Sequence, residues 1–109
     1  MLEPLLGSAI REKVLVYLCA REEGYARQIS RFFKTDLAPV QKQLERLEIG
    51  GIIFSRSAGR TRLYAFNPRY PFLDELKVLL DKALSFYPSG QREELVMNRK
   101  RPRRKDKPL

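Results

Sequence analysis

The side chains with the most recognisable chemistry are arginines, lysines and glutamines gathered in three short segments. Glutamine can pair with adenine in the major groove of DNA, arginine or lysine can pair with guanine, and every cationic side chain can bind phosphate. These residue types therefore indicate recognition of a nucleic acid. The candidates are Arg27 and Arg31 in the first segment, Pro39, Gln41, Lys42, Gln43 and Arg46 in the second, and Arg56, Arg60 and Arg62 in the third.

The net charge favours the same kind of partner. The chain has 22 Lys and Arg against 13 Asp and Glu, a formal charge of +9. Such an excess attracts polyanions, and the phosphate backbone of a nucleic acid gives a basic surface its largest gain through counterion release. An anionic membrane surface is the second candidate, because charge alone does not separate the two. We expect double-stranded DNA as the partner and no membrane contact.

Several classes of site are excluded by what the sequence lacks. It has no histidine and one cysteine, Cys19, so zinc fingers, thiolate clusters, internal disulfides and histidine-based catalysis cannot be built. We expect no metal, no cofactor and no enzymatic activity, and we expect Cys19 to be a buried apolar residue. The sequence also shows no signal peptide and no apolar run of about 20 residues, which predicts a soluble cytoplasmic protein.

Two helices are predicted in the first third of the chain. Ser8 is a good N-cap, and apolar residues then recur at helical spacing up to the stop signal at 22–24. A second, shorter helix is predicted from about Tyr25 to Phe33. Arg27 and Arg31 would lie on its exposed face, where contacts to the DNA backbone and simple solvation are equally expected.

A third predicted helix carries the candidate base-contacting residues. Asp36 is expected to cap its start, and Gly50-Gly51 to end it. Its inward stripe would consist of Val40, Leu44 and Leu47, which leaves Pro39, Gln41, Lys42, Glu45 and Arg46 outside and Gln43 near the edge. This outer face could be ordinary solvated surface. We expect base or phosphate contact from Gln41, Lys42 or Gln43, and less from Arg46 near the helix C-terminus.

A β-hairpin is predicted next. Two β-prone runs, 52–56 and 61–66, are separated by the segment 57–60, which contains a glycine and an arginine. Arg56, Arg60 and Arg62 surround this tip with no acidic residue between them, and a phosphate backbone would relieve their repulsion. Alternatively, the charges protect an edge strand from aggregation. We expect DNA contact from Arg60 before the other two.

The last predicted helix, about 72–86, has more apolar surface than one core face needs. We therefore expect a homodimer, which would match a two-fold symmetric DNA site. The expected interface consists of Phe72, Leu73, Leu76, Leu79, Leu80 and Leu84.

The composition changes at Pro88, after which basic residues and prolines dominate. We expect residues 1–87 to form one domain and 88–109 a basic, mostly disordered tail. Its run from Arg99 to Lys107 could be a DNA-binding arm, an RNA or membrane contact, or a solubilising segment.

The order of these elements is that of a winged helix-turn-helix, an α+β fold that is mostly α. It has a three-helix core, a β-hairpin wing and a C-terminal helix. The stretch from Ile10 to Leu84 resembles the ArsR/MarR-like winged-helix regulators. The resemblance is to a subgroup with Gly59-Arg60-Thr61-Arg62-Leu63-Tyr64, then Asn67-Pro68 and Tyr70-Pro71. The segment from Val40 to Glu48, with Gly50-Gly51, resembles the recognition helix of that family.

The resemblance implies sequence-specific binding of duplex DNA and regulation of transcription. The third helix would enter the major groove and the wing would lie on the backbone or in the minor groove. Members of this subgroup often sit beside, or are fused to, a nucleotidyltransferase domain. The alternative it implies is an adaptor that binds a separately encoded nucleotidyltransferase, and an exposed apolar patch on the wing or the third helix would favour that alternative.

Overall fold

The computed structural model describes residues 1–96, and residues 97–109 lie outside the described part. The elements follow in the order α1 (Glu3–Leu6), α2 (Ala9–Arg21), β1 (Glu23–Tyr25), α3 (Ala26–Phe33), α4 (Leu37–Ile49), β2 (Ile53–Ala58), β3 (Thr61–Phe66) and α5 (Leu73–Leu84). A further helix covers residues 89–96.

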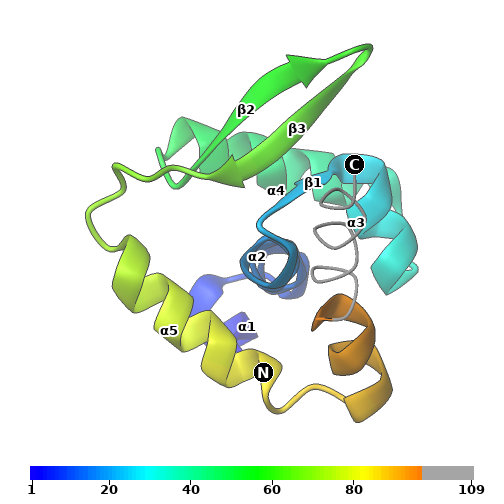
Figure 1. Ribbon diagram of the computed structural model, residues 1–109, viewed down its shortest axis with the longest axis vertical. Coiled ribbons are helices and arrows are strands. Elements are labelled where there is room, and N and C mark those ends of the chain that lie inside the picture. Colours follow the sequence, from blue (N-terminus) through cyan, green and yellow to red (C-terminus); the bar gives the residue numbers. More distant parts are fainter. Residues whose placement is uncertain (97–109) are drawn as a thin grey trace, which may run out of the picture.

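Helix α2 is the centre of the molecule. The Ser8 hydroxyl oxygen accepts a hydrogen bond from the Arg11 backbone N–H at 3.1 Å, which confirms the predicted N-cap. Val14, Val16 and Leu18 on this helix are completely buried. Figure 1 shows the reason, because the other helices and the sheet surround α2 on several sides. A helix that is apolar on most of its faces must be enclosed in this way.

The predicted hairpin is present, and a third strand joins it. The antiparallel sheet has the order β1-β3-β2, and a two-residue turn at Gly59 and Arg60 connects β2 to β3. Gly59 has a φ of +68°, in the left-handed region that favours glycine. Strand β1 was not predicted, since three residues with a central glycine show no alternation. At Gly24 a Cβ atom would lie 2.7 Å from Cε1 of the buried Tyr17, so only glycine lets this strand approach α2.

The prediction that a mostly disordered tail begins at residue 88 is wrong for the residues that directly follow Pro88. Residues 89–96 are helical, Leu95 is completely buried in the main core, and Val96 packs against that core. The Arg21 Nε donates a hydrogen bond to the Leu95 carbonyl oxygen at 3.4 Å. Leu95, Val96 and the hydrogen bond from Arg21 together hold this otherwise polar helix against the core. The basic run from Arg99 to Lys107 lies outside the described residues.

The inward face of α5 corrects part of the predicted dimer interface. Leu80 is completely buried and Leu84 is 8% exposed within the single chain, and Leu73 and Leu76 are half-buried against the same core. These four residues follow one another at helical spacing, so they face α2 together. Phe72 remains exposed, as do Val78 and Phe86, and Leu79 is half-buried but is not part of the core cluster.

A buried carboxylate on α2 binds the N-terminus and the segment that follows α5. The carboxylate of Glu12 accepts hydrogen bonds from the Leu2 backbone N–H and from the Tyr87 hydroxyl, both at 2.7 Å, and lies 3.4 Å from the Met1 ammonium. Burial raises the pKa of Glu12, but the hydrogen bonds from Tyr87 and Leu2 and the ammonium charge lower it more, so the pKa lies below its ordinary value. Burial and the hydrogen bond to Glu12 raise the pKa of Tyr87.

We expect this carboxylate to make stability depend on pH. A folded-state pKa below the unfolded value gives stabilisation that is present above the unfolded pKa and is lost as the pH falls through the folded pKa. Glu12→Gln should therefore lower the free energy of unfolding by about 1–3 kcal/mol at neutral pH and by less in acid. Urea unfolding at about pH 7 and pH 3 measures this difference. A difference in unfolding free energy between wild type and Glu12→Gln that is the same at both pH values would contradict this expectation.

Candidate nucleic-acid interface

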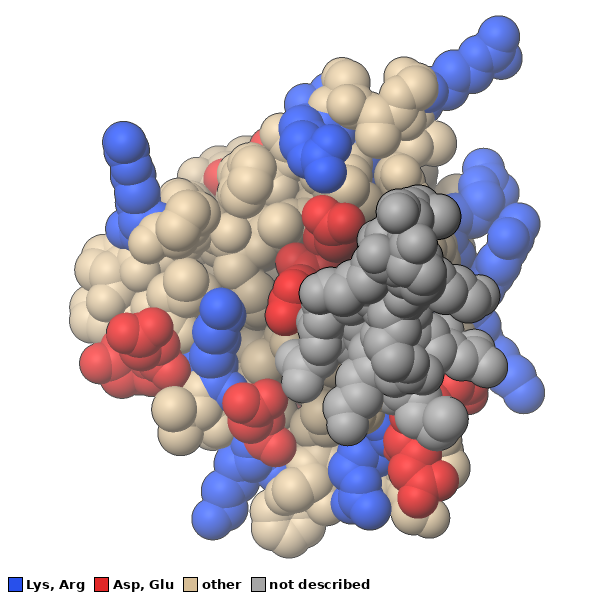
Figure 2. Space-filling view, in the orientation of Figure 1, with Lys and Arg blue, Asp and Glu red and all other residues tan. Residues whose placement is uncertain are grey.

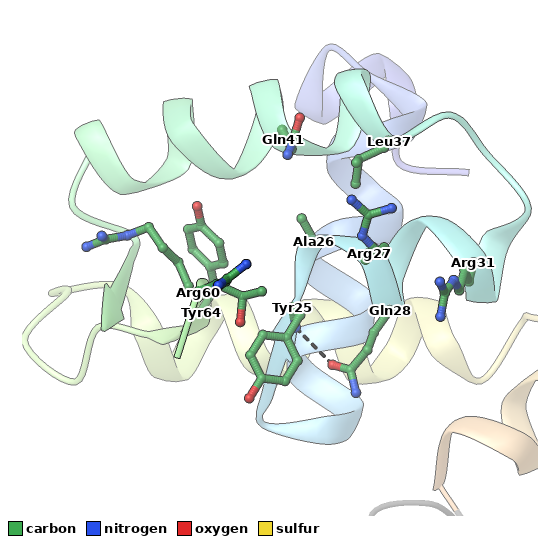
Figure 3. Close-up of a pocket in the computed structure, with 11 residues that line it drawn as sticks. Tyr25, Ala26, Arg27, Gln28, Arg31, Leu37, Gln41, Arg60 and Tyr64 are labelled. Carbon is green, nitrogen blue, oxygen red and sulfur yellow. Dashed lines mark hydrogen bonds between the residues drawn. The ribbon is translucent and has the colours of Figure 1, made fainter. Parts of the chain in front are cut away.

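A groove of about 540 Å³ lies between α3, the first turns of α4 and the hairpin (Figure 3). It brings together five predicted contact residues from three segments that are far apart in the sequence. Helix α3 contributes Arg27 and Arg31, α4 contributes Gln41, and the hairpin contributes Arg60 and Arg62. Tyr25, Ala26, Gln28, Leu37, Thr61 and Tyr64 complete the lining.

The ends of α4 are set by its flanking residues. Lys34 takes a left-handed conformation in the turn before the helix, and Asp36 occupies the N-cap position with an extended backbone. The predicted capping hydrogen bond from Asp36 is not made. At the other end the N–H of Ile52 bonds to the carbonyl of Leu47, that of Gly51 to Glu48, and Gly51 has a φ of +79°. This pattern is a Schellman motif, and it confirms the predicted glycine stop.

The two faces of α4 are largely as predicted. Val40, Leu44 and Leu47 are buried, and Pro39, Gln41, Lys42 and Arg46 are exposed, as is Glu45. Gln41 lines the groove beside the hairpin, whereas Pro39 and Arg46 lie toward the other edge of the exposed face. Lys42 projects between these two edges.

Gln43 does not belong to the exposed face, which removes the structural basis for its predicted contact with DNA. It is 8% exposed, and its Oε1 accepts a hydrogen bond from Arg11 Nε at 2.9 Å. The reason is its position, three residues after Val40 and four before Leu47, which puts it on the inner side of the helix. Its polar character suggested the surface, but its spacing decides its orientation.

The three arginines of the hairpin differ in their surroundings. Arg56 forms an ion pair with Glu23 of β1, with Nη2 and Oε1 3.6 Å apart and both side chains exposed. Arg62 Nε donates to the Ser55 hydroxyl at 2.9 Å, and that hydroxyl donates to Glu48 on α4 at 2.8 Å. Arg60, at the tip, has no ion pair or side-chain hydrogen bond within the described part of the chain. Its guanidinium is therefore the most available for a phosphate.

Glu23, the acid that pairs with Arg56, was not foreseen as a partner, because it lies on the unpredicted strand β1.

Glu48, which accepts a hydrogen bond from Ser55, also affects the pKa of Tyr64. Burial raises the pKa of Tyr64, and the negative charge of Glu48 raises it further against the opposing influence of Arg62. Thr61 and Tyr64 were also missed as groove residues, although the alternation of a strand places Tyr64 on the same side as Arg62.

Charge is divided unevenly over the molecule. Residues 26–69, which contain α3, α4 and the hairpin, have nine Lys and Arg against three Asp and Glu. Residues 1–25 and 70–96 together have six Lys and Arg against nine Asp and Glu. In Figure 2 a basic side chain projects at the hairpin tip, and most of the visible acids lie below the hairpin. A polyanion is therefore attracted to the half that contains the groove.

Other kinds of site find little support between residues 1 and 96. No three or more Cys, Asp or Glu side chains gather there in a way that could hold a metal ion. No helix in that range has the length and apolar character needed to cross a membrane. Cys19, expected to be buried, is half-buried, and its Sγ lies 3.4 Å from Asp81 Oδ1.

No family model and no curated protein matches the sequence. Solved structures match its fold, among them a double mutant of Lactococcus lactis ZitR. The TM-score is 0.57 at 26% identity, covering 73% of this chain and 57% of that chain. The adhesin competence repressor AdcR of Streptococcus pyogenes gives a TM-score of 0.56 at 16% identity, with 88% of this chain and 83% of that one covered. The transcriptional regulator SlyA gives 0.52 at 17%, with 96% and 80% covered.

These neighbours are winged-helix regulators of the MarR type. The match spans little more than half the length of ZitR, and the two longer matches are below 20% identity, so the comparison establishes architecture. The predicted α+β fold is confirmed, and the chain has the winged-helix fold of these transcriptional regulators.

Proposed function

We propose that this chain binds duplex DNA with sequence preference and regulates transcription. Helix α4 would enter the major groove, and the β2–β3 hairpin, here called the wing, would lie on the backbone or in the minor groove. The observation that supports this most is the groove that gathers Arg27, Arg31, Gln41, Arg60 and Arg62. The fold shared with transcriptional regulators supports it independently.

The contacts divide into two groups in this proposal. Arg27, Arg31 and Arg60 bind phosphates, because they are exposed and frame the groove. Gln41 and Lys42 read base edges from the exposed face of α4. Arg56 and Arg62 contribute less, since Glu23 and Ser55 already bind them, and Pro39 and Arg46 flank the reading face. The basic run from Arg99 to Lys107 adds affinity without sequence preference.

Selection of bound fragments from a pool of random duplexes tests the proposal. We expect enrichment of a defined motif after a few rounds at about 0.15 M salt, because base contacts from α4 discriminate where phosphate contacts do not. Recovery of fragments with no shared motif would contradict sequence preference. Failure to retain any duplex would contradict DNA binding itself.

We also propose that the chain forms a homodimer through the outer side of α5. Phe72 is 62% exposed, Val78 70% and Phe86 67%, Leu79 is half-buried, and exposed apolar side chains of this size favour association. A dimer would present two copies of α4 to an inverted repeat.

Light scattering at tens of micromolar should give the mass of a dimer, and Phe72→Ser with Val78→Ser should shift it toward a monomer. The double variant Leu5→Ser with Ile49→Ser is the control, because it replaces apolar side chains that are equally exposed but lie off α5. A monomeric wild type at that concentration would contradict the dimer.

An adaptor role is the second candidate, and two side chains favour it. Ile49, at the end of α4, is 80% exposed, and Phe54, on β2, is 42% exposed. Apolar residues on the third helix and the wing are what a protein partner, such as a separately encoded nucleotidyltransferase, would bind. If Ile49→Ser and Phe54→Ser leave DNA binding intact but abolish binding to that enzyme, the adaptor role is supported.

A further inference from the structure

We propose that Arg11 and Gln43 are positioning residues that fix the rotation of α4 about its own axis and thereby set its preference for DNA sequence. The inference rests on the proposed function. Its starting point is the hydrogen bond from Arg11 Nε to Gln43 Oε1, 2.9 Å long, which joins the beginning of α2 to the middle of α4.

Gln43 is a polar residue on an apolar face. Val40, Leu44 and Leu47 on the same side are at most 3% exposed, and Gln43 is 8% exposed. Apolar contacts are non-directional, so they hold α4 against α2 without fixing a small rotation of the helix. A hydrogen bond weakens steeply when its partners are misaligned, and an amide without its partner is costly to bury. The Gln43 amide therefore fixes the rotation of α4 about its axis, which the apolar contacts of the leucines and valine do not determine.

Arg11 is itself held in place. Its Nη1 donates to the Leu6 carbonyl oxygen at 3.1 Å, and its backbone N–H donates to the Ser8 hydroxyl at 3.1 Å. Leu6 ends α1, where Gly7 reverses the chain with a φ of +84°. A planar guanidinium bound on two sides keeps one orientation. The donor that meets Gln43 is thus anchored to α1 and to the first turn of α2.

The anchored turn of α4 is the one that carries the proposed base contacts. Gln41 and Lys42 precede Gln43 directly and project from the exposed face. Contacts to base edges tolerate displacements of only about 0.5 Å or 10–20°, whereas a long cationic side chain can still reach a phosphate after a small rotation. Loss of the Arg11–Gln43 bond should therefore reduce sequence preference more than general affinity.

A double-mutant cycle tests this. Arg11→Met and Gln43→Met keep side-chain volume and remove the bond, and Lys13→Met is the control, because it removes one positive charge from α2 at a residue with no hydrogen bond to α4. The ratio of affinities for the selected and a scrambled duplex should fall about tenfold in each single variant and no further in the double variant. The affinity of the single variants for the scrambled duplex should stay within about twofold of the affinity of Lys13→Met for that duplex. Gln43→Glu keeps an acceptor toward the guanidinium and should preserve the ratio.

Three results would overturn the proposal: an unchanged ratio, additive losses in the double variant, or equal losses on both duplexes. If the wild type prefers no duplex, the proposed function fails instead, and hydrogen exchange of the free protein decides the positioning role. Backbone amides of α4 should exchange faster in Arg11→Met and Gln43→Met than in Lys13→Met. Equal exchange in all three variants would show that the pair does not hold α4.

Discussion

Leu95→Ala should lower the free energy of unfolding by about 2–5 kcal/mol, the range measured when fully buried leucines are truncated. The side chain is completely buried in the same core as Leu15, Tyr17 and Ile29, although it follows a stretch of charged and polar residues. Leu5→Ala is the matched control, because Leu5 is 67% exposed on α1 and its truncation should change the free energy by less than about 0.5 kcal/mol.

Urea unfolding followed by circular dichroism measures both variants. Equal stability of Leu95→Ala and Leu5→Ala would contradict the placement of the 89–96 helix in the folded domain. The result also decides how the basic run should be tested. A deletion that starts at Pro88 removes Leu95 together with the arginines and confuses folding with binding, so a deletion should start after Val96.

The second large effect concerns the phosphate contacts at the two sides of the groove. Removing Arg27 and Arg60 together should weaken binding to every duplex, whether selected or scrambled. Each lost phosphate contact lowers the slope of log affinity against log salt by about 0.9, so the double variant Arg27→Ala with Arg60→Ala should lose nearly two units. The ranking of sites should remain, because phosphates contain no sequence information.

Arg56→Ala provides the control for charge alone. Its guanidinium is 3.6 Å from Glu23, so its removal should change the salt slope less than removal of Arg60. Binding titrations at several salt concentrations distinguish the variants. If the salt slope is unchanged in the Arg27 and Arg60 double variant, the phosphate contacts lie elsewhere. The same conclusion holds if Arg56→Ala lowers the salt slope as much as removal of Arg60 does.

Local patterns predicted the helices that form the interface. The Ser8 cap, the spacing of Val40, Leu44 and Leu47, and the glycine pair at 50–51 depend on interactions within one or two turns, so the sequence expresses them directly. The hairpin and its tip were predictable for the same reason.

What could not be predicted depends on contacts between distant segments. Strand β1 forms because it pairs with β3, which is about 40 residues away in the sequence. Leu95 is buried because it packs against core residues from much earlier in the chain. Leu80 and Leu84 looked like excess apolar surface, since the sequence does not show how much surface α2 must cover. The convergence of Arg27 with Arg60 likewise becomes visible only in the folded chain.

Gln43 is a different case, because two local signals disagreed. Residue type favoured the surface, and helical spacing favoured the interior. The conflict was itself informative: a polar residue on an inner face needs a partner, and that partner proved to be Arg11 on another helix. Such conflicts mark positions where a polar contact fixes an orientation that apolar packing leaves free.

The most direct test of the account is the affinity of Lys42→Ala for the selected and the scrambled duplex, beside wild type and Arg60→Ala at one salt concentration. Lys42→Ala should lose about 1–3 kcal/mol on the selected duplex and much less on the scrambled one, with preference relaxed at one or two positions. Arg60→Ala should weaken both duplexes alike. If Lys42→Ala changes neither the affinity nor the preference, while Arg60→Ala accounts for all the loss, α4 does not read DNA sequence and the central claim is wrong.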